Sequence, residues 1–259
     1  MADTGALTPS PVPDVRQITV SDLTASLSAG WHDFLKAPLF GLFFSAVYVL
    51  VGIALVSLGA GTLAWTFVMS LGFPLAAPFA AVGLYEVSRR LECGKAMDWS
   101  RVLGVVVKEK DRQIPWIGAI IVFYFLFWSF LAHMIFALFM GLSAMTNVSS
   151  SYEVFLTPDG LTMIAVELCV GAVFAFVLFA LTVVSLPLLL EKELDFVTAM
   201  LVSLDAVRQN LALMLVWAAV IATLLLLAMV PYFLGLLVVL PVLGHATWHL
   251  YRRLLNHEA

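Results

Sequence analysis

Apolar residues in this chain come in long blocks that are separated by short polar segments. Residues 37–85 and 113–152 contain no Asp, Glu, Lys or Arg, and the segment between them, 86–112, carries seven of the thirteen Lys and Arg residues. A helix needs about 20 apolar residues to cross the hydrocarbon core of a bilayer, so the first block is long enough for two spans and a turn. The pattern predicts a protein that crosses a membrane several times.

Six transmembrane helices account for the apolar blocks. Pro74 and Pro78 are expected to kink the second span, and Pro241 to interrupt the sixth. We interpret the kinks as a consequence of tight helix packing, which small neighbouring residues favour, with a gate or cavity as the alternative. The predicted spans are Leu39–Leu58, Leu63–Tyr85, Trp116–Met140, Thr162–Leu190, Leu211–Val230 and Tyr232–Leu250.

Three segments beside the spans have the pattern of amphipathic helices. In the first, apolar residues recur at steps of three and four, while Ser26 and Asp33 fall on the opposite, polar side. Trp31 in this segment is expected to anchor it in the headgroup layer. The three segments are Thr19–Leu35, a helix capped by Asp98, and Leu194–Leu204. The predicted fold class is therefore all-α: a polytopic bundle of six transmembrane helices with amphipathic interfacial helices.

The distribution of basic residues predicts the orientation. With six spans, all thirteen Lys and Arg residues lie on the same side as both termini, and the opposite loops contain none. Because cytoplasmic loops are enriched in Lys and Arg, this side is predicted to be the cytoplasm, and the amphipathic helices lie there too. The expected organisation is a disordered cytoplasmic tail (1–17), one six-span membrane domain (18–253) and a short cytoplasmic tail (254–259).

Composition supports the membrane prediction and narrows the function. Hydrophobic residues make up 63% of the chain and charged residues 12%, and the mean hydropathy is +1.05, whereas soluble domains are typically about 45–50% apolar. No basic domain suggests nucleic acid, and the two cysteines give no disulfide framework. No phosphate loop, dinucleotide fingerprint, zinc-protease pair or nucleophile elbow appears, so neither an enzyme nor a cofactor is expected.

Ionisable residues inside the spans are the candidate functional groups, because they are costly in lipid. His133 in the third span and Glu167 in the fourth lie at similar predicted depth on sequential antiparallel helices. A contact between them would either hold two helices together or bind a proton or a cation. We leave both alternatives open, with the structural pair favoured.

Weaker candidates lie near the cytoplasmic ends of two spans. His245 and His249 are one helical turn apart and could ligate a metal, although a helix C-terminus and the interface favour histidines in any case. Glu86 is followed closely by Arg89 and Arg90, so local ion pairs with the neighbouring loops are expected there. No metal site is predicted from either group.

Two stretches carry a resemblance to a known family. The first reads Gly-Trp-His-Asp-Phe at 30–34 and Pro-Leu-Phe-Gly-Leu-Phe at 38–43. The second reads Pro-Phe-Ala-Ala-Val-Gly-Leu-Tyr-Glu-Val-Ser-Arg-Arg-Leu-Glu at 78–92, followed by Gly94. These stretches resemble a bacterial family of predicted integral membrane proteins, domain-of-unknown-function family 2189, over about Ile18 to Arg253. The resemblance implies a multi-pass protein of the bacterial inner membrane and transfers no catalytic role.

The expected function is that of a non-enzymatic accessory or scaffold protein of the membrane. Its expected partners are the lipid bilayer and other membrane proteins or further copies of itself. The alternative is a small-molecule or ion transporter or channel, in which Pro74, Pro78 and Pro241 would break helices around a cavity.

Cysteine labelling tests the predicted orientation. An impermeant thiol reagent added to intact cells should react with a cysteine introduced by Ser150→Cys and should not reach the native Cys93 in the basic segment. Cys93 should react once the membrane is permeabilised, which serves as the control. Labelling of Cys93 in sealed cells would overturn the orientation.

Overall fold

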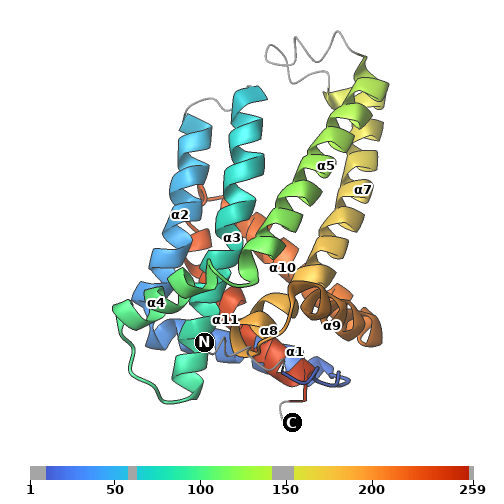
Figure 1. Cartoon of the computed structure of the whole chain (residues 1–259). Coiled ribbons are helices and arrows are strands. Elements are labelled where there is room, and N and C mark those ends of the chain that lie inside the picture. The colour runs from blue at the N-terminus through green and yellow to red at the C-terminus, as the bar shows by residue number, and fades with distance from the viewer. Residues whose placement is uncertain (1–9, 58–62, 142–154, 257–259) are drawn as a thin grey trace, which may run out of the picture.

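The computed structural model describes residues 10–57, 63–141 and 155–256, with the side chains of 55–56 and 63–76 outside the description. The regular structure within these residues is helical (Figure 1). The helices are α1 (Val20–Lys36), α2 (Pro38–Ser57), α3 (Leu63–Glu92), α4 (Trp99–Glu109), α5 (Ile114–Met140), α7 (Pro158–Thr182), α8 (Ser185–Glu191), α9 (Phe196–Gln209), α10 (Leu211–Met229) and α11 (Leu236–Leu254).

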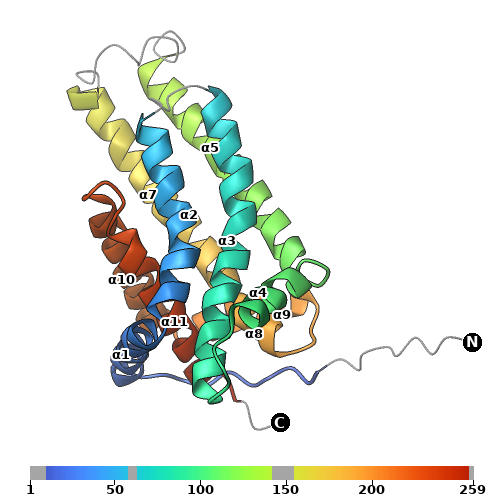
Figure 2. The same ribbon diagram turned by 90° about the vertical axis from the view of Figure 1, so that its left-hand side faces the viewer.

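The long helices stand upright, and the short ones gather at one end (Figures 1 and 2). Helices α2 and α3 form one upright pair, α5 and α7 a second, and α10 and α11 a shorter hairpin. Within the described residues, three helical segments are long and apolar enough to cross a membrane, and the bent pair α1–α2 would make a fourth if it counts as one span. The all-α class with several membrane-spanning helices is therefore confirmed. The three segments are Ile114–Met140, Pro158–Glu191 and Leu211–Met229.

Prolines set the two sharp breaks in the helical path. Helices α1 and α2 meet at an angle of 100°, because Pro38 begins α2 and disfavours a helical conformation at Ala37. The predicted fourth span, Thr162–Leu190, divides into α7 and α8 four residues before Pro187, which has no N–H to bond the preceding turn. Ser203 of α9 bridges the break: its Oγ accepts from the Val184 N–H at 3.1 Å and donates to the Ala180 carbonyl at 2.7 Å.

Helix α11 is the centre of the fold. Its C-terminal half is enclosed by α1, α2 and α3, and Trp248, Tyr251 and Leu254 are almost completely buried. Glycine permits the closest of these contacts: a Cβ atom on Gly30 of α1 would lie 2.5 Å from the backbone nitrogen of Ala246. The backbones of α1 and α11 therefore touch directly, and α1 belongs to the core.

This packing corrects the predicted polarity of the first amphipathic segment. Ser26 and Asp33, expected on its wet side, are buried against α11, while Trp31 remains 44% exposed. The reason is that α11 offers polar partners at both positions: His249 lies 2.7 Å from Asp33, and Arg253 donates to Ser26 Oγ at 3.3 Å. The N-cap predicted at Asp98 is confirmed, since its side chain accepts a hydrogen bond from the Ser100 N–H at the start of α4.

The N-terminal segment is docked where the sequence predicts a disordered tail. Residues 10–17 run along the lower end of the helices (Figure 2), with backbone bonds from Arg16 to Leu254 and from Asn256 to Asp14. The Asn210 side chain, at the junction of α9 and α10, accepts from the Ile18 N–H at 2.9 Å and donates to the Arg16 carbonyl. Residues 1–9 lie outside the described part of the chain.

The same substitution at two helical glycines should have opposite effects. Gly30→Ala would push α1 away from α11, and overpacking of this kind costs about 1–3 kcal/mol. Gly104→Ala on α4 meets no atom within 4 Å and should stabilise its helix by up to about 1 kcal/mol. Thermal unfolding in detergent measures both changes. Equal effects at the two sites would contradict the close contact at Gly30.

Candidate functional site

A buried polar cluster joins three helices at the lower end of the fold. Asp33 of α1 pairs with His249 of α11 at 2.7 Å between Oδ2 and Nε2. Next to it, Ser88 of α3 lies 2.8 Å from Nδ1 of His245 on α11, with Ser88 and His245 fully buried. Ser88 also hydrogen-bonds to Asp33. The four side chains thus form one connected network, which we call the α11 cluster.

The α11 cluster keeps its carboxylate ionised. Burial acts to raise the pKa of Asp33, but the side-chain interactions with His249, Ser88 and His245 outweigh it, so the pKa is lowered. Among the described residues, Nε2 of His245 has no hydrogen-bond partner. The side chain of His245 is therefore held through Nδ1 alone.

A second network surrounds the cluster and reaches the end of α8. Arg252 bridges Glu92 of α3 at 3.1 Å and Glu191 of α8 at 2.8 Å. The indole N–H of Trp248 donates to the same Glu92 at 3.0 Å, and the Tyr251 hydroxyl donates to Glu191. Polar contacts along about two turns of α11, from His245 to Arg252, therefore connect this helix to its neighbours.

Glu86 is buried, and its partners lie mainly on its own helix. Only 1% of its side chain is exposed, and its oxygens lie 2.6 Å from Arg89 and 2.7 Å from Arg90. Arg90 also donates to the Ala96 carbonyl in the loop before α4 at 3.1 Å. The expected ion pairs thus form within α3, and the contact with the neighbouring loop comes from Arg90.

His133 and Glu167 lie on the adjacent helices α5 and α7 but are not bonded to each other. His133 is exposed on the helix surface, with Nδ1 2.7 Å from the Ser129 carbonyl. The two side chains are near enough for an electrostatic interaction, yet within the described residues no hydrogen bond or ion pair joins them. The structure therefore places the two residues on neighbouring helices without a direct bond, and their interaction within the membrane stays a prediction.

The two histidines of α11 point to separate partners. Within the described residues, no group of three or more His, Cys, Asp or Glu side chains is arranged to hold a metal ion. His249 bonds Asp33, and His245 bonds Ser88. The arrangement fits the reading of these histidines as structural residues, and their chemistry is hydrogen bonding between helices.

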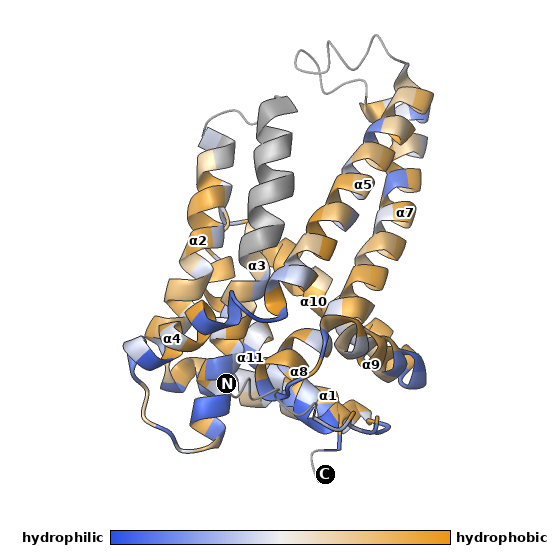
Figure 3. Cartoon of the chain, viewed as in Figure 1, coloured by the Kyte–Doolittle hydropathy of each residue, from blue (hydrophilic) through white to orange (hydrophobic). Residues whose placement is uncertain are grey.

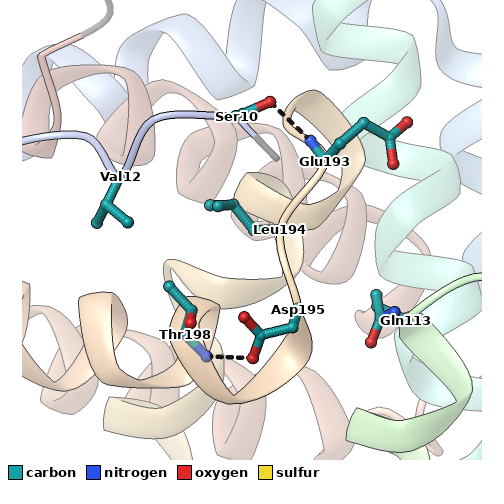
Figure 4. Close-up of a pocket in the computed structure, with 7 residues that line it drawn as sticks. All are labelled: Ser10, Val12, Gln113, Glu193, Leu194, Asp195 and Thr198. Carbon is teal, nitrogen blue, oxygen red and sulfur yellow. Dashed lines mark hydrogen bonds between the residues drawn. The ribbon is translucent and has the colours of Figure 1, made fainter. Parts of the chain in front are cut away.

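A shallow pocket opens beside the docked N-terminal segment (Figure 4). It has a volume of about 390 Å³ and lies between the N-terminal segment and the start of α9. Its polar groups are already engaged: Glu193 N–H donates to Ser10 Oγ at 3.1 Å, and Asp195 accepts from Thr198 N–H at 2.9 Å. This pocket reflects how the N-terminal segment docks.

Sequence reasoning missed several members of the two networks. The sequence pattern places Asp33 on the polar face of its helix, and no motif marks Ser88, Glu92 or Glu191. One signal was available, since Asp33 lies three residues from Gly30 on the same helical face, where a close helix contact would bury it. No local pattern marks the partners, because they are brought together by tertiary packing.

Comparison with known proteins supports the membrane assignment. The model of the family "Predicted integral membrane protein (DUF2189)" matches residues 66–191, just under half of the chain. The match contains the second motif, 78–92, and confirms the resemblance to this family. No curated protein and no solved structure matches the chain significantly. The chain is thus similar to a family of integral membrane proteins whose function is unknown.

Removal of Asp33 should destabilise the protein in a pH-dependent way. Asp33→Asn withdraws the carboxylate from His249 and Ser88, and the lost charged hydrogen bonds should cost about 1–3 kcal/mol at neutral pH. Because the folded pKa is lowered, this stabilisation is present above the unfolded pKa of about 3.9 and disappears as the pH falls through the lower folded pKa. The gap in thermal stability between native protein and variant should therefore narrow below about pH 4.

The exposed Asp205 of α9 provides the matched control for that experiment. Asp205→Asn makes the same chemical change outside the α11 cluster, so it should alter thermal stability much less at neutral pH. Equal losses in the two variants, or a gap for Asp33→Asn that does not depend on pH, would contradict the described role of the carboxylate.

A double-mutant cycle tests the pairing of His133 and Glu167. If the two side chains interact in the membrane, His133→Leu and Glu167→Leu should each leave a polar group without its partner, at about 1–3 kcal/mol. The double variant should then lose less stability than the two single variants added together. Unfolding in detergent supplies the free energies. Strict additivity would show that the two groups do not interact.

Proposed function

We propose that this chain is a non-enzymatic accessory or scaffold protein of the bacterial inner membrane. In this proposal α2, α3, α5, α7, α10 and α11 cross the bilayer, and both termini lie in the cytoplasm. Helices α1, α4 and α9 lie at the cytoplasmic surface. The single observation that carries the proposal is the use of buried polar groups on α11 to join helices.

The distribution of polar residues supports the proposed topology. Hydrophilic residues are concentrated at the end of the molecule that holds α1, α4 and α9, while the upright helices are predominantly apolar (Figure 3). Arg252 and Arg253 end α11 at this same polar end. A bilayer around the upright helices would leave the basic segments in water, as the positive-inside rule requires.

The contacts of the polar groups support a structural role. The described charged groups near α11 bond to side chains of α1, α3 and α8, so their hydrogen-bonding capacity is directed to helix association. In contrast, the most apolar windows of α5 and α10 are largely exposed: only 11% and 17% of them are buried. These faces are available to lipid and to other membrane proteins, which is the surface that a scaffold needs.

The prolines give little support to the transporter alternative. That alternative predicts that Pro74, Pro78 and Pro241 surround one hydrated cavity. Pro78 and Pro241 are both buried, and Pro241 packs where a side chain on Gly41 of α2 would sit. Neither proline lines the pocket beside the N-terminal segment or the space between α2, α3, α10 and α11, and the side chain of Pro74 is outside the described residues. Close helix packing therefore explains the two described prolines better than a passage does.

Crosslinking in intact cells tests the scaffold proposal. Purification after crosslinking should recover a membrane protein in near-stoichiometric amount, and Phe130→Ala on the exposed face of α5 should lower that recovery several-fold. Leu50→Ala, at a similarly exposed position on α2, is the matched control and should leave it unchanged. Recovery of the chain alone, together with solute flux through liposomes that contain the purified protein, would favour the transporter instead.

A further inference from the structure

An apolar cavity lies between four of the proposed spans. Side chains of α2, α3, α10 and α11 surround a partly open space of about 170 Å³. Helix α11 contacts the other three helices, whereas α10 has few contacts with α2 or α3. The cavity therefore occupies the place where α10 stands apart from the first pair of spans.

The hydroxyl groups in its wall are already used. Ser45 donates to the Gly41 carbonyl at 2.8 Å, and Thr247 donates to the Leu243 carbonyl at 2.8 Å. The Tyr48 hydroxyl donates to the Ala77 carbonyl at 3.4 Å. The remaining lining side chains are apolar. A water molecule needs two to four polar partners, so this wall is suited to an apolar ligand.

The size of the cavity limits the ligand to a small apolar group. An engineered apolar cavity of about 150 Å³ in another protein stays dry and binds benzene, and the present cavity is of similar volume. The space exists because Ala80 and Ala81 of α3 face it, where larger side chains would fill it. A ring or a short length of hydrocarbon chain therefore fits, and a polar headgroup does not.

We propose that this cavity binds the end of a lipid acyl chain. The inference rests on the proposed six-span topology, which places the cavity at the depth of the hydrocarbon. Acyl chains are then the apolar groups present at the highest local concentration. An inserted chain end would contact α10 on one side and α2 and α3 on the other, and so would supply the packing that these helices lack between themselves.

Photocrosslinking with a phospholipid that carries a diazirine at the end of one acyl chain tests the proposal. The protein in detergent micelles is titrated with this lipid, and the labelled residues are mapped by mass spectrometry. Labelling of the cavity residues Leu225 and Leu240 should saturate, because the site is finite. Labelling of the exposed Phe123 and Leu138 of α5 should rise in proportion to the lipid. The proposal would be overturned if Leu225 and Leu240 are not labelled, or if their labelling rises in proportion to the lipid without saturating.

Filling variants identify the cavity as the source of the saturable signal. Ala81→Leu fills it from α3 and Ile221→Phe from α10, and each should lower the saturable labelling several-fold. Ala165→Leu, at an exposed position on α7, is the matched control and should leave it unchanged. Unaltered saturable labelling in the filling variants would place the lipid elsewhere. Labelling of α5 depends only on the exposure of this helix to lipid and not on the cavity. Its absence would therefore contradict the proposed six-span topology.

Discussion

The fold depends on the pairing of one buried carboxylate. Asp33 faces α11 at the point where Gly30 brings two helix backbones into contact, and an ionised group at such a place is tolerated only if it is hydrogen-bonded. His249 and Ser88 supply those bonds from α11 and α3. Loss of the hydrogen bonds to this carboxylate costs about 1–3 kcal/mol, so the contact constrains how α1 packs. The positions of α1, α3 and α11 relative to one another follow from it.

The outer network extends the same principle toward the polar end of the molecule. Arg252 joins α3 to α8, while Arg112 in the loop before α5 pairs with Glu109 at 2.6 Å and also with Glu193. Charged residues that the positive-inside rule assigns to the cytoplasm thus also join separate helices. The polar end of such a protein is held together by ion pairs between its helices, while its long apolar helices keep exposed faces. This arrangement suits a role in assembling other membrane components.

The sequence was sufficient for the features that depend on local pattern. The long apolar blocks led to the all-α membrane class, and Asp98 led to the start of α4, because hydropathy and capping act over a few residues. It was insufficient where tertiary contacts decide. The residues near Ser26 and Asp33 do not distinguish a solvent-exposed helix face from one that packs against polar groups of α11. Likewise, the apolar residues that line the cavity have the same sequence pattern as a lipid-facing surface.

Hydrogen–deuterium exchange of the purified protein tests the central claim most directly. Helices α1 and α4 are both short amphipathic helices outside the upright bundle, but only α1 is joined to α11 through Gly30 and Asp33. We therefore expect backbone amides of α1 and of the lower half of α11 to exchange together and much more slowly than those of α4. Exchange in α1 that is as fast as in α4, while α11 stays protected, would show that the buried pair does not hold the fold together.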